Sequence, residues 1–184
     1  MSNKIKSEKN HKPMKTIPSN FESVPLGNKS ESTCSPKIES WDFRGIILNS
    51  PKKIRISDEF ILPLCGTHQL SELFINKFKK YDHEIVIVVT DTSTYKSYSG
   101  KLSKPGFKSE DYAKAIGSDE ELERNTVGGW FNIDVFDYVK SLPEKEGKYI
   151  IYATIGDLKS NVVEVEIGIE KGNTPAPRQP RPNF

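Results

Sequence analysis

The residues best suited to chemistry in this sequence are a cysteine and a histidine three positions apart, in Cys65-Gly66-Thr67-His68. An imidazole beside a thiol can accept its proton and leave a nucleophilic thiolate. The same C-x-x-H spacing could supply two of the four ligands of a zinc site. Because a free cysteine usually behaves as a small buried hydrophobic residue, we expect Cys65 to be structural. A thiol- or metal-dependent enzyme centred on Cys65 and His68 is the alternative.

Few other residues could complete such a site. The remaining histidines are His11 and His83, and the only other cysteine is Cys34. A bridge between Cys34 and Cys65 is an alternative that we do not favour, because nothing else in the sequence marks an oxidising location. We therefore predict no enzyme activity, no catalytic residue, no metal ligand and no cofactor, and we leave the binding residues unassigned.

Acidic residues gather at two places, at positions 119–121 and at Asp134 and Asp137. A calcium loop needs oxygen ligands at regular alternating positions, and neither group has that spacing. Helix caps and solvated surface explain these residues better. The sequence also lacks a glycine-rich phosphate loop and the G-x-S-x-G and H-E-x-x-H motifs.

Aromatic residues form a third candidate site. Trp130 and Phe131 follow two glycines, and together with Trp41, Tyr95 and Tyr98 they could form a platform for sugars or peptides. Aromatic side chains also dominate the interior of β-proteins. We expect these residues to lie in the core, and a carbohydrate-binding protein is the alternative.

Alternating hydrophobic residues predict the elements that must position these side chains. Residues 148–155 and 162–169 each place apolar residues at every second position, which is typical of strands buried on one face. The polar loop 156–161 between them predicts that the two strands are adjacent and antiparallel. Residues 84–90 form a continuous apolar run that predicts another strand, either covered on both faces or at the centre of the sandwich.

Further elements follow from the same patterns and from their boundary residues. Ser118 and Glu121 have the spacing of a capping box. The remaining predicted elements are strands at 41–48, 53–57 and 95–102, a strand through about residue 70 followed by a short helix or loop, a helical excursion at 108–126, and a short helix at 135–142 ended by Pro143.

The approach to residues 148–155, Glu146-Gly147-Lys148-Tyr149, resembles the acid–Gly–x–Tyr lead-in to the penultimate strand of immunoglobulin-like sandwiches. The resemblance covers residues 144–169. It implies a tyrosine corner, in which the hydroxyl of Tyr149 bonds to the backbone a few residues upstream. The Cys, Trp and Cys pattern of true immunoglobulin domains is not met, because neither cysteine lies in these last strands. A shared fold does not imply a shared function.

Composition divides the chain into three parts. Residues 1–40 hold seven lysines against four glutamates with scattered apolar residues, which predicts a disordered basic leader. Residues 41–170 are expected to form one β-sandwich domain, and residues 171–184 a proline-rich tail. The tail contains a P-x-x-P at 177–180, which could dock an aromatic groove, although a plain linker is expected.

Charge and hydropathy limit the partners. The formal net charge of +2 gives no overall field towards nucleic acid. No stretch approaches the roughly 20 apolar residues that cross a bilayer, and the first residues do not resemble a secretory signal. We therefore expect neither nucleic-acid binding nor membrane insertion. The cytoplasm is the default location, and leaderless export stays open.

Together these observations predict an all-β protein, an immunoglobulin-like antiparallel β-sandwich with a short helical insertion and disordered tails. The expected function is that of a non-catalytic protein-binding or structural module. Such a module would engage another protein through its loops, a sheet edge or its tails. The oligomeric state is not predicted.

Overall fold

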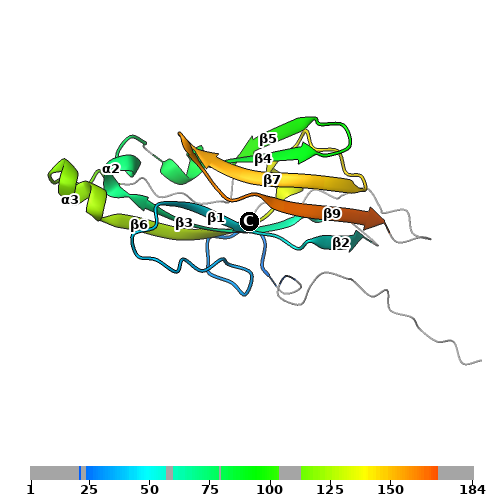
Figure 1. The fold of residues 1–184 in the computed structure, drawn as a ribbon, viewed down its shortest axis with the longest axis horizontal. Helices are drawn as coiled ribbons and strands as arrows, with labels where there is room; N and C mark the ends of the chain where they lie inside the picture. The colour runs from blue at the N-terminus through cyan, green and yellow to red at the C-terminus, as the bar shows by residue number, and fades with distance from the viewer. Residues whose placement is uncertain (1–20, 22–23, 57–59, 79, 104–112, 170–184) are drawn as a thin grey trace, which may run out of the picture.

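The computed structural model describes residue 21 and residues 24–56, 60–78, 80–103 and 113–169. Two β-sheets form the body of the protein (Figure 1). The first has the strand order β1-β3-β6, from β1 (Gly45–Asn49), β3 (Pro63–Ser71) and β6 (Thr126–Asp134). The second has the order β2-β9-β7-β4-β5, with β8 pairing β7, and consists of β2 (Lys53–Ile56), β4 (Val86–Asp91), β5 (Ser97–Lys101), β7 (Gly147–Ile155), β8 (Leu158–Lys159) and β9 (Val163–Ile169).

One hydrophobic core joins the two sheets, because alternate residues of their strands face each other. Leu64, Phe131 and Ile133 contribute from the first sheet, and Ile87 and Ile151 from the second. All five are at most 1% exposed. At about 25 cal/mol per Å² of apolar surface removed from water, this burial is the main favourable term in folding.

The predicted strand pair at the end of the chain is confirmed. β7 and β9 are antiparallel neighbours, with Tyr149 opposite Val165 and Ile151 opposite Val163. β4 pairs with the other edge of β7, also antiparallel. Of the two alternatives for residues 84–90, cover on both faces is wrong, because buried and half-buried residues alternate along β4. β4 lies inside its sheet, between β7 and β5. The prediction of an entirely antiparallel protein is also wrong, because the chain leaves β1, crosses to the second sheet and runs parallel to β9 as β2.

Three short helices, α2, α3 and α4, lie where local signals predicted a helix, and η1 was not predicted. α3 (Asp119–Arg124) begins with the predicted capping box, in which the hydroxyl of Ser118 accepts from the backbone of Glu121 and the Glu121 carboxylate accepts from the backbone of Ser118. The capping bonds lower the pKa of the Glu121 carboxyl. The other helices are α2 (Glu72–Ile75), η1 (Tyr81–Glu84) and α4 (Val135–Tyr138). The first part of the predicted excursion, residues 108–112, lies outside the described residues.

The predicted disordered leader is wrong for residues 24–40. This segment, which we call the strap, runs beside the first sheet (Figure 1) and is attached to it by hydrogen bonds and by a disulfide from Cys34 to Cys65. Cys34 is fully buried, in a small cluster with Cys65 and Phe21. The composition of residues 1–40 predicted disorder because it contains few apolar residues. The strap is held instead by polar contacts and one covalent bond, and it needs no hydrophobic face of its own. Residues 1–20 and the proline-rich tail, including the P-x-x-P, lie outside the described residues.

Candidate binding groove

The structure does not bring Cys65 and His68 together. Both lie on β3, where successive side chains point to opposite faces, so residues three apart face opposite sides of the sheet. Cys65 points to the outer face, where it is disulfide-bonded to Cys34 with the Cα atoms 5.9 Å apart. The predicted free thiol and the alternative of a thiol- or metal-dependent site at this pair are therefore both wrong. The disulfide itself is the bridge that the sequence left as the less favoured alternative.

His68 is a buried side chain of the opposite face of β3. Its Nε2 lies 3.3 Å from the Tyr81 hydroxyl, and the imidazole is 4% exposed. The ring covers Gly129 on the neighbouring strand, where an added Cβ would approach its Cε1 to 2.8 Å. Gly66 makes room for the ring of Phe131 in the same way. These two glycines explain how β3 and β6 pack their aromatic residues against bare backbone.

The acidic residues serve as helix caps and surface, as expected. Asp134 is fully buried, and its Oδ1 accepts from the backbone N–H of Leu62 at 3.1 Å and of Phe136 at 3.2 Å, which caps α4. Among the described residues, no group of three or more His, Cys, Asp or Glu side chains is arranged to hold a metal ion.

The aromatic residues divide between core and surface. Phe131 is 1% exposed, as expected, whereas Trp41 is 82%, Tyr95 is 85% and Trp130 is 38% exposed. The expectation that the tryptophans and Tyr95 are core residues is therefore wrong. Trp130 belongs to the first sheet and Tyr95 follows β4 in the second, so the sequence grouping does not correspond to one site.

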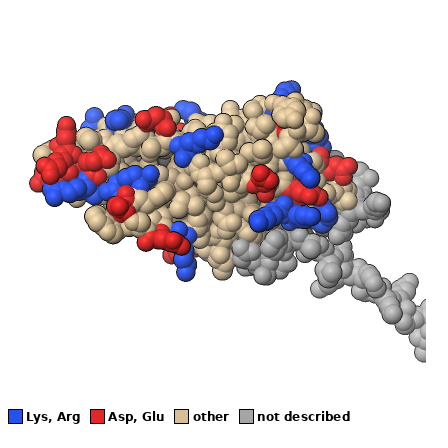
Figure 2. Space-filling view, in the orientation of Figure 1, with Lys and Arg blue, Asp and Glu red and all other residues tan. Residues whose placement is uncertain are grey.

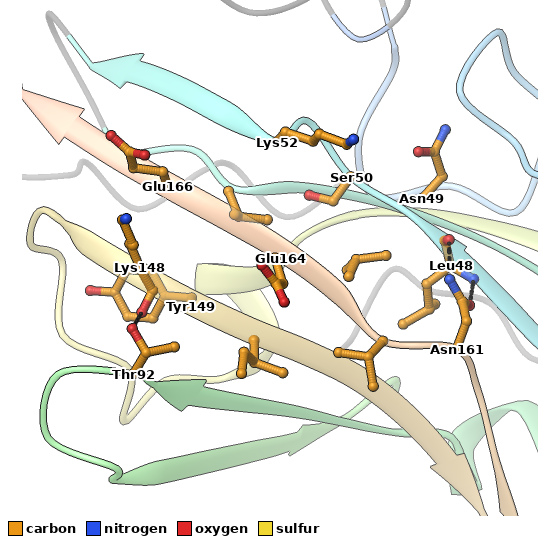
Figure 3. A pocket seen from close by; sticks show the side chains of 14 residues that line it. Leu48, Asn49, Ser50, Lys52, Thr92, Lys148, Tyr149, Asn161, Glu164 and Glu166 are labelled. Carbon is orange, nitrogen blue, oxygen red and sulfur yellow. Dashed lines mark hydrogen bonds between the residues drawn. The ribbon is translucent and has the colours of Figure 1, made fainter.

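A groove with a volume of about 670 Å³ lies where the chain crosses between the sheets, and this is our candidate site (Figure 3). One wall is the end of β1 and the connection to β2, with Asn49, Ser50 and Lys52. The other wall comes from β7 and the residue Thr92 that follows β4. The floor and the open side are residues 161–166, at the start of β9.

Asn161 fixes one end of the groove by bonding both backbone groups of a residue in the facing sheet. Its Oδ1 accepts from the Leu48 N–H at 2.7 Å, and its Nδ2 donates to the Leu48 carbonyl at 3.0 Å (Figure 3). A side-chain amide thus takes the place of a neighbouring strand at the end of β1. Further along the same wall as Leu48, the hydroxyl of Ser50 donates to the Pro63 carbonyl at 2.8 Å, which fixes the β1–β2 connection.

Beyond Asn161, one edge of β9 is open. The parallel pairing with β2 begins only at Glu166, whose N–H donates to the Lys52 carbonyl at 2.9 Å. Backbone groups of successive residues in a strand point to alternate edges, so the N–H and C=O of Glu164 point to the same side as those of Glu166. Within the described part of the chain, no strand lies alongside β9 at Glu164 on that side. The groove therefore contains an unpaired donor and acceptor of a strand edge.

Both charged and apolar side chains surround the open edge of β9. The Glu166 carboxylate is 3.8 Å from Lys53 and 3.7 Å from Arg55. Glu164 is exposed and stands opposite the apolar Ile150 of β7, in the middle of the groove (Figure 3). Val162 is 49% exposed beside it. Figure 2 shows charged side chains at both ends of this face and along its margins, around an uncharged patch near its middle.

The wall formed by β7 is held by a tyrosine corner and by an ion pair between the buried Asp91 and the half-exposed Lys145. The Tyr149 hydroxyl donates to the Lys145 carbonyl at 3.1 Å, which confirms the corner predicted from the sequence. The Lys145 ammonium donates to Asp91 Oδ2 at 2.6 Å, and Asp91 Oδ1 accepts from the backbone and hydroxyl of Ser93. Asp91 is the β4 residue opposite Tyr149, so these contacts fix the start of β7 against the end of β4.

These contacts shift the pKa values of the groups involved. The hydrogen bond from Lys145, followed by those from Ser93, holds the pKa of the Asp91 carboxyl far below its usual value, and the same hydrogen bond raises the pKa of Lys145. Burial, with a smaller contribution from the Asp91 charge, raises the pKa of Tyr149 to about 12. Both charges of the pair and the neutral tyrosine are therefore the stable forms at neutral pH.

No protein-family model and no curated protein matches this chain, so its function has to be inferred from the geometry. Among the described helices, none is both long and apolar enough to cross a membrane. The sequence did not indicate the groove. The one local sign of the groove in the sequence was the alternation in residues 162–169, which places Glu164 and Glu166 on the outward face. The open edge itself depends on where β2 begins to pair with β9.

Proposed function

We propose that this protein is a non-catalytic binding module that engages an extended segment of another protein along the open edge of β9. The observation that carries the proposal is the edge of β9 at Glu164, which lies in the groove. Among the described residues, no strand pairs with the backbone N–H and C=O of Glu164. Extended segments bind such edges by main-chain hydrogen bonds, and side-chain pockets supply the specificity.

The side chains around the edge suggest the chemistry of the partner segment. A strand added beside β9 would present alternate side chains to its two faces. Inward-facing side chains would meet Leu48 and Val163, which favours apolar residues. An outward-facing side chain would stand beside the exposed carboxylate of Glu164, which favours lysine or arginine. The expected segment therefore alternates apolar and basic residues.

The finer fold class is part of the proposal. We assign the two sheets to the immunoglobulin-like sandwiches, on the support of the Tyr149 corner and its place at the start of β7. In this class the outer strands of each sheet leave an edge exposed. Here β2 covers only part of the edge of β9, because the chain crosses from the first sheet to the second before β2 begins. A solved structure with a Greek-key connection different from that class would remove this assignment and leave the groove proposal intact.

The proposal is tested with short peptides selected from a displayed random library on the full chain. Their affinities are then measured for wild type, Glu164→Pro and Glu164→Ala. Proline removes the N–H that faces the groove and leaves the β7 ladder intact, because that N–H points away from β7. We expect Glu164→Pro to weaken binding about tenfold or more, the equivalent of one hydrogen bond.

Glu164→Ala is the matched control, since it keeps the N–H and removes the carboxylate. We expect it to weaken binding by only about threefold, as for an exposed ion pair. Thermal unfolding checks that both variants are folded. Selection of no peptide, or equal affinity of the selected peptides for wild type and Glu164→Pro, would contradict the proposal.

A carbohydrate-binding function is the second candidate, supported by the exposed tryptophans. Trp130 stands opposite Thr67 on the outer face of the first sheet, and the Trp41 carbonyl accepts from Gln69 of the same face at 2.7 Å. Exposed indole rings stack on sugars. Titration with soluble oligosaccharides distinguishes the two functions: a change in tryptophan fluorescence that is lost in Trp130→Ala supports this candidate, and no change excludes it for the sugars tried.

A further inference from the structure

The strap is attached to the first sheet at three places besides the disulfide. The carboxamide of Asn132, which is fully buried, donates to Asn28 Oδ1 at 2.9 Å and to the Ser30 carbonyl at 2.7 Å. The Thr67 hydroxyl donates to the Pro36 carbonyl at 2.7 Å. Asn49 donates to the Cys34 carbonyl at 2.9 Å. The strap is thus bound almost wholly by polar groups.

Its apolar contacts form a cluster separate from the main core. That cluster contains Phe21, Cys34 and Cys65, with Val24 packed against it, and it shares no residue with the core between the sheets. When the strap opens, water can replace its hydrogen bonds to the sheet, so each of these bonds adds little net stability. The disulfide is therefore the principal attachment of the strap to the first sheet. The core of the two sheets does not depend on it.

The strap pairs with a strand edge at one residue, Asn132 of β6. β6 is the edge strand of the first sheet, and the strap lies along the edge that faces away from β3. There the Asn132 N–H donates to the Asn28 carbonyl at 2.9 Å, and the Gly27 N–H donates to the Asn132 carbonyl at 2.6 Å. An uncovered strand edge pairs readily with other chains. Removing the strap would expose both backbone groups of Asn132 together with its buried carboxamide.

We infer that the Cys34–Cys65 disulfide is a latch that fastens the strap over the edge of β6 in an oxidising compartment. In the reduced chain the two sheets stay folded, and this edge is open. The inference is independent of the proposed function at β9. It also bears on location, because the cytoplasm was the default only while nothing marked an oxidising environment, and a structural disulfide is such a mark.

The chemistry is a thiol–disulfide exchange. The Cys34 and Cys65 thiols together lose two electrons and two protons as the Sγ–Sγ bond forms, and a disulfide-bearing oxidant is reduced to two thiols. Both cysteines are fully buried in the product. A reductant thiolate therefore reaches a sulfur atom only during brief local openings around the disulfide, which slows reduction of the closed latch.

The test is hydrogen exchange followed by mass spectrometry on the full chain, in oxidised wild type and in Cys34→Ala/Cys65→Ala. We expect amides of residues 24–40 and of Asn132 to exchange about tenfold faster or more in the double variant, with residues 147–155 unchanged. Equal protection of the strap in both proteins, or faster exchange throughout the double variant, would overturn the inference.

Two further measurements keep the test decisive. Wild type reduced with excess dithiothreitol reproduces the open state without a substitution, and it must show the same pattern. Asn132→Ala keeps the disulfide and should open only the bridge at Asn28, so release of the whole strap by this variant alone would show that the amide, not the latch, holds it. Free thiols on protein alkylated directly in its native source would exclude an oxidising location.

Discussion

The carboxamide of Asn161 replaces a strand at the end of β1, with its Oδ1 2.7 Å from the Leu48 nitrogen and its Nδ2 3.0 Å from the Leu48 oxygen. This pair of bonds connects the two sheets at the point where the groove begins. It also separates the closed part of the sandwich from the open edge of β9, so the position of the groove depends on one side chain.

Asn161→Ala should destabilise the protein by about 1–3 kcal/mol, because it leaves the N–H and C=O of the buried residue Leu48 without their partner. Urea unfolding at neutral pH measures the loss. Glu164→Ala, an exposed position in the same groove, is the control and should change the stability by less than about 0.5 kcal/mol. Equal stability of the two variants would show that the Asn161 bonds contribute nothing.

Acid should destabilise the protein through Asp91. The folded state holds the pKa of this carboxyl far below the value of about 3.9 found in unfolded chains. Its contribution to stability is therefore present above about pH 4 and is lost as the pH falls towards the folded pKa. Asp91→Asn should have a lower urea midpoint at pH 7 and a weaker dependence on pH below 4. A pH dependence identical to that of wild type would contradict the role given to the Asp91–Lys145 pair.

Alkali should act through the buried tyrosines. Burial raises the pKa of both Tyr149 and Tyr138 to about 12, whereas tyrosine in an unfolded chain ionises near 10. Their contribution is fully present below pH 10 and decreases as the pH rises from about 10 to 12, because the unfolded state loses its protons first. Tyr149→Phe should cost about 1 kcal/mol at pH 7 and should flatten this decrease. No loss of stability at pH 7 in this variant would contradict the corner's stabilising role.

Local patterns predicted much of the fold. Alternation located β7 and β9 and their pairing, the capping residues located α3, and the lead-in Glu146 to Tyr149 predicted a hydrogen bond that the structure contains. Each of these features depends on residues close together in the sequence, or on a period that one strand shows by itself.

The features that the sequence did not predict depend on contacts between distant segments. The strap is bound through Asn132, about one hundred residues further along the chain, and its polar composition gave no sign of a packed segment. The faces of Cys65 and His68 could be assigned only once the strand was known to run without interruption from Pro63 to Ser71. The open edge of β9 depends on where β2 joins it, and no local pattern encodes that point.

Amide hydrogen exchange at two neighbouring residues of β9 shows whether the strand edge at Glu164 is open. The N–H of Val165 points to β7, and the N–H of Glu164 points into the groove. Resolved by NMR on the full chain, the Val165 amide should be protected at least about a hundredfold over the rate of an unfolded chain, and the Glu164 amide should exchange close to that rate. Similar strong protection at Glu164 would show that another segment already pairs with this edge and would contradict the proposed binding site.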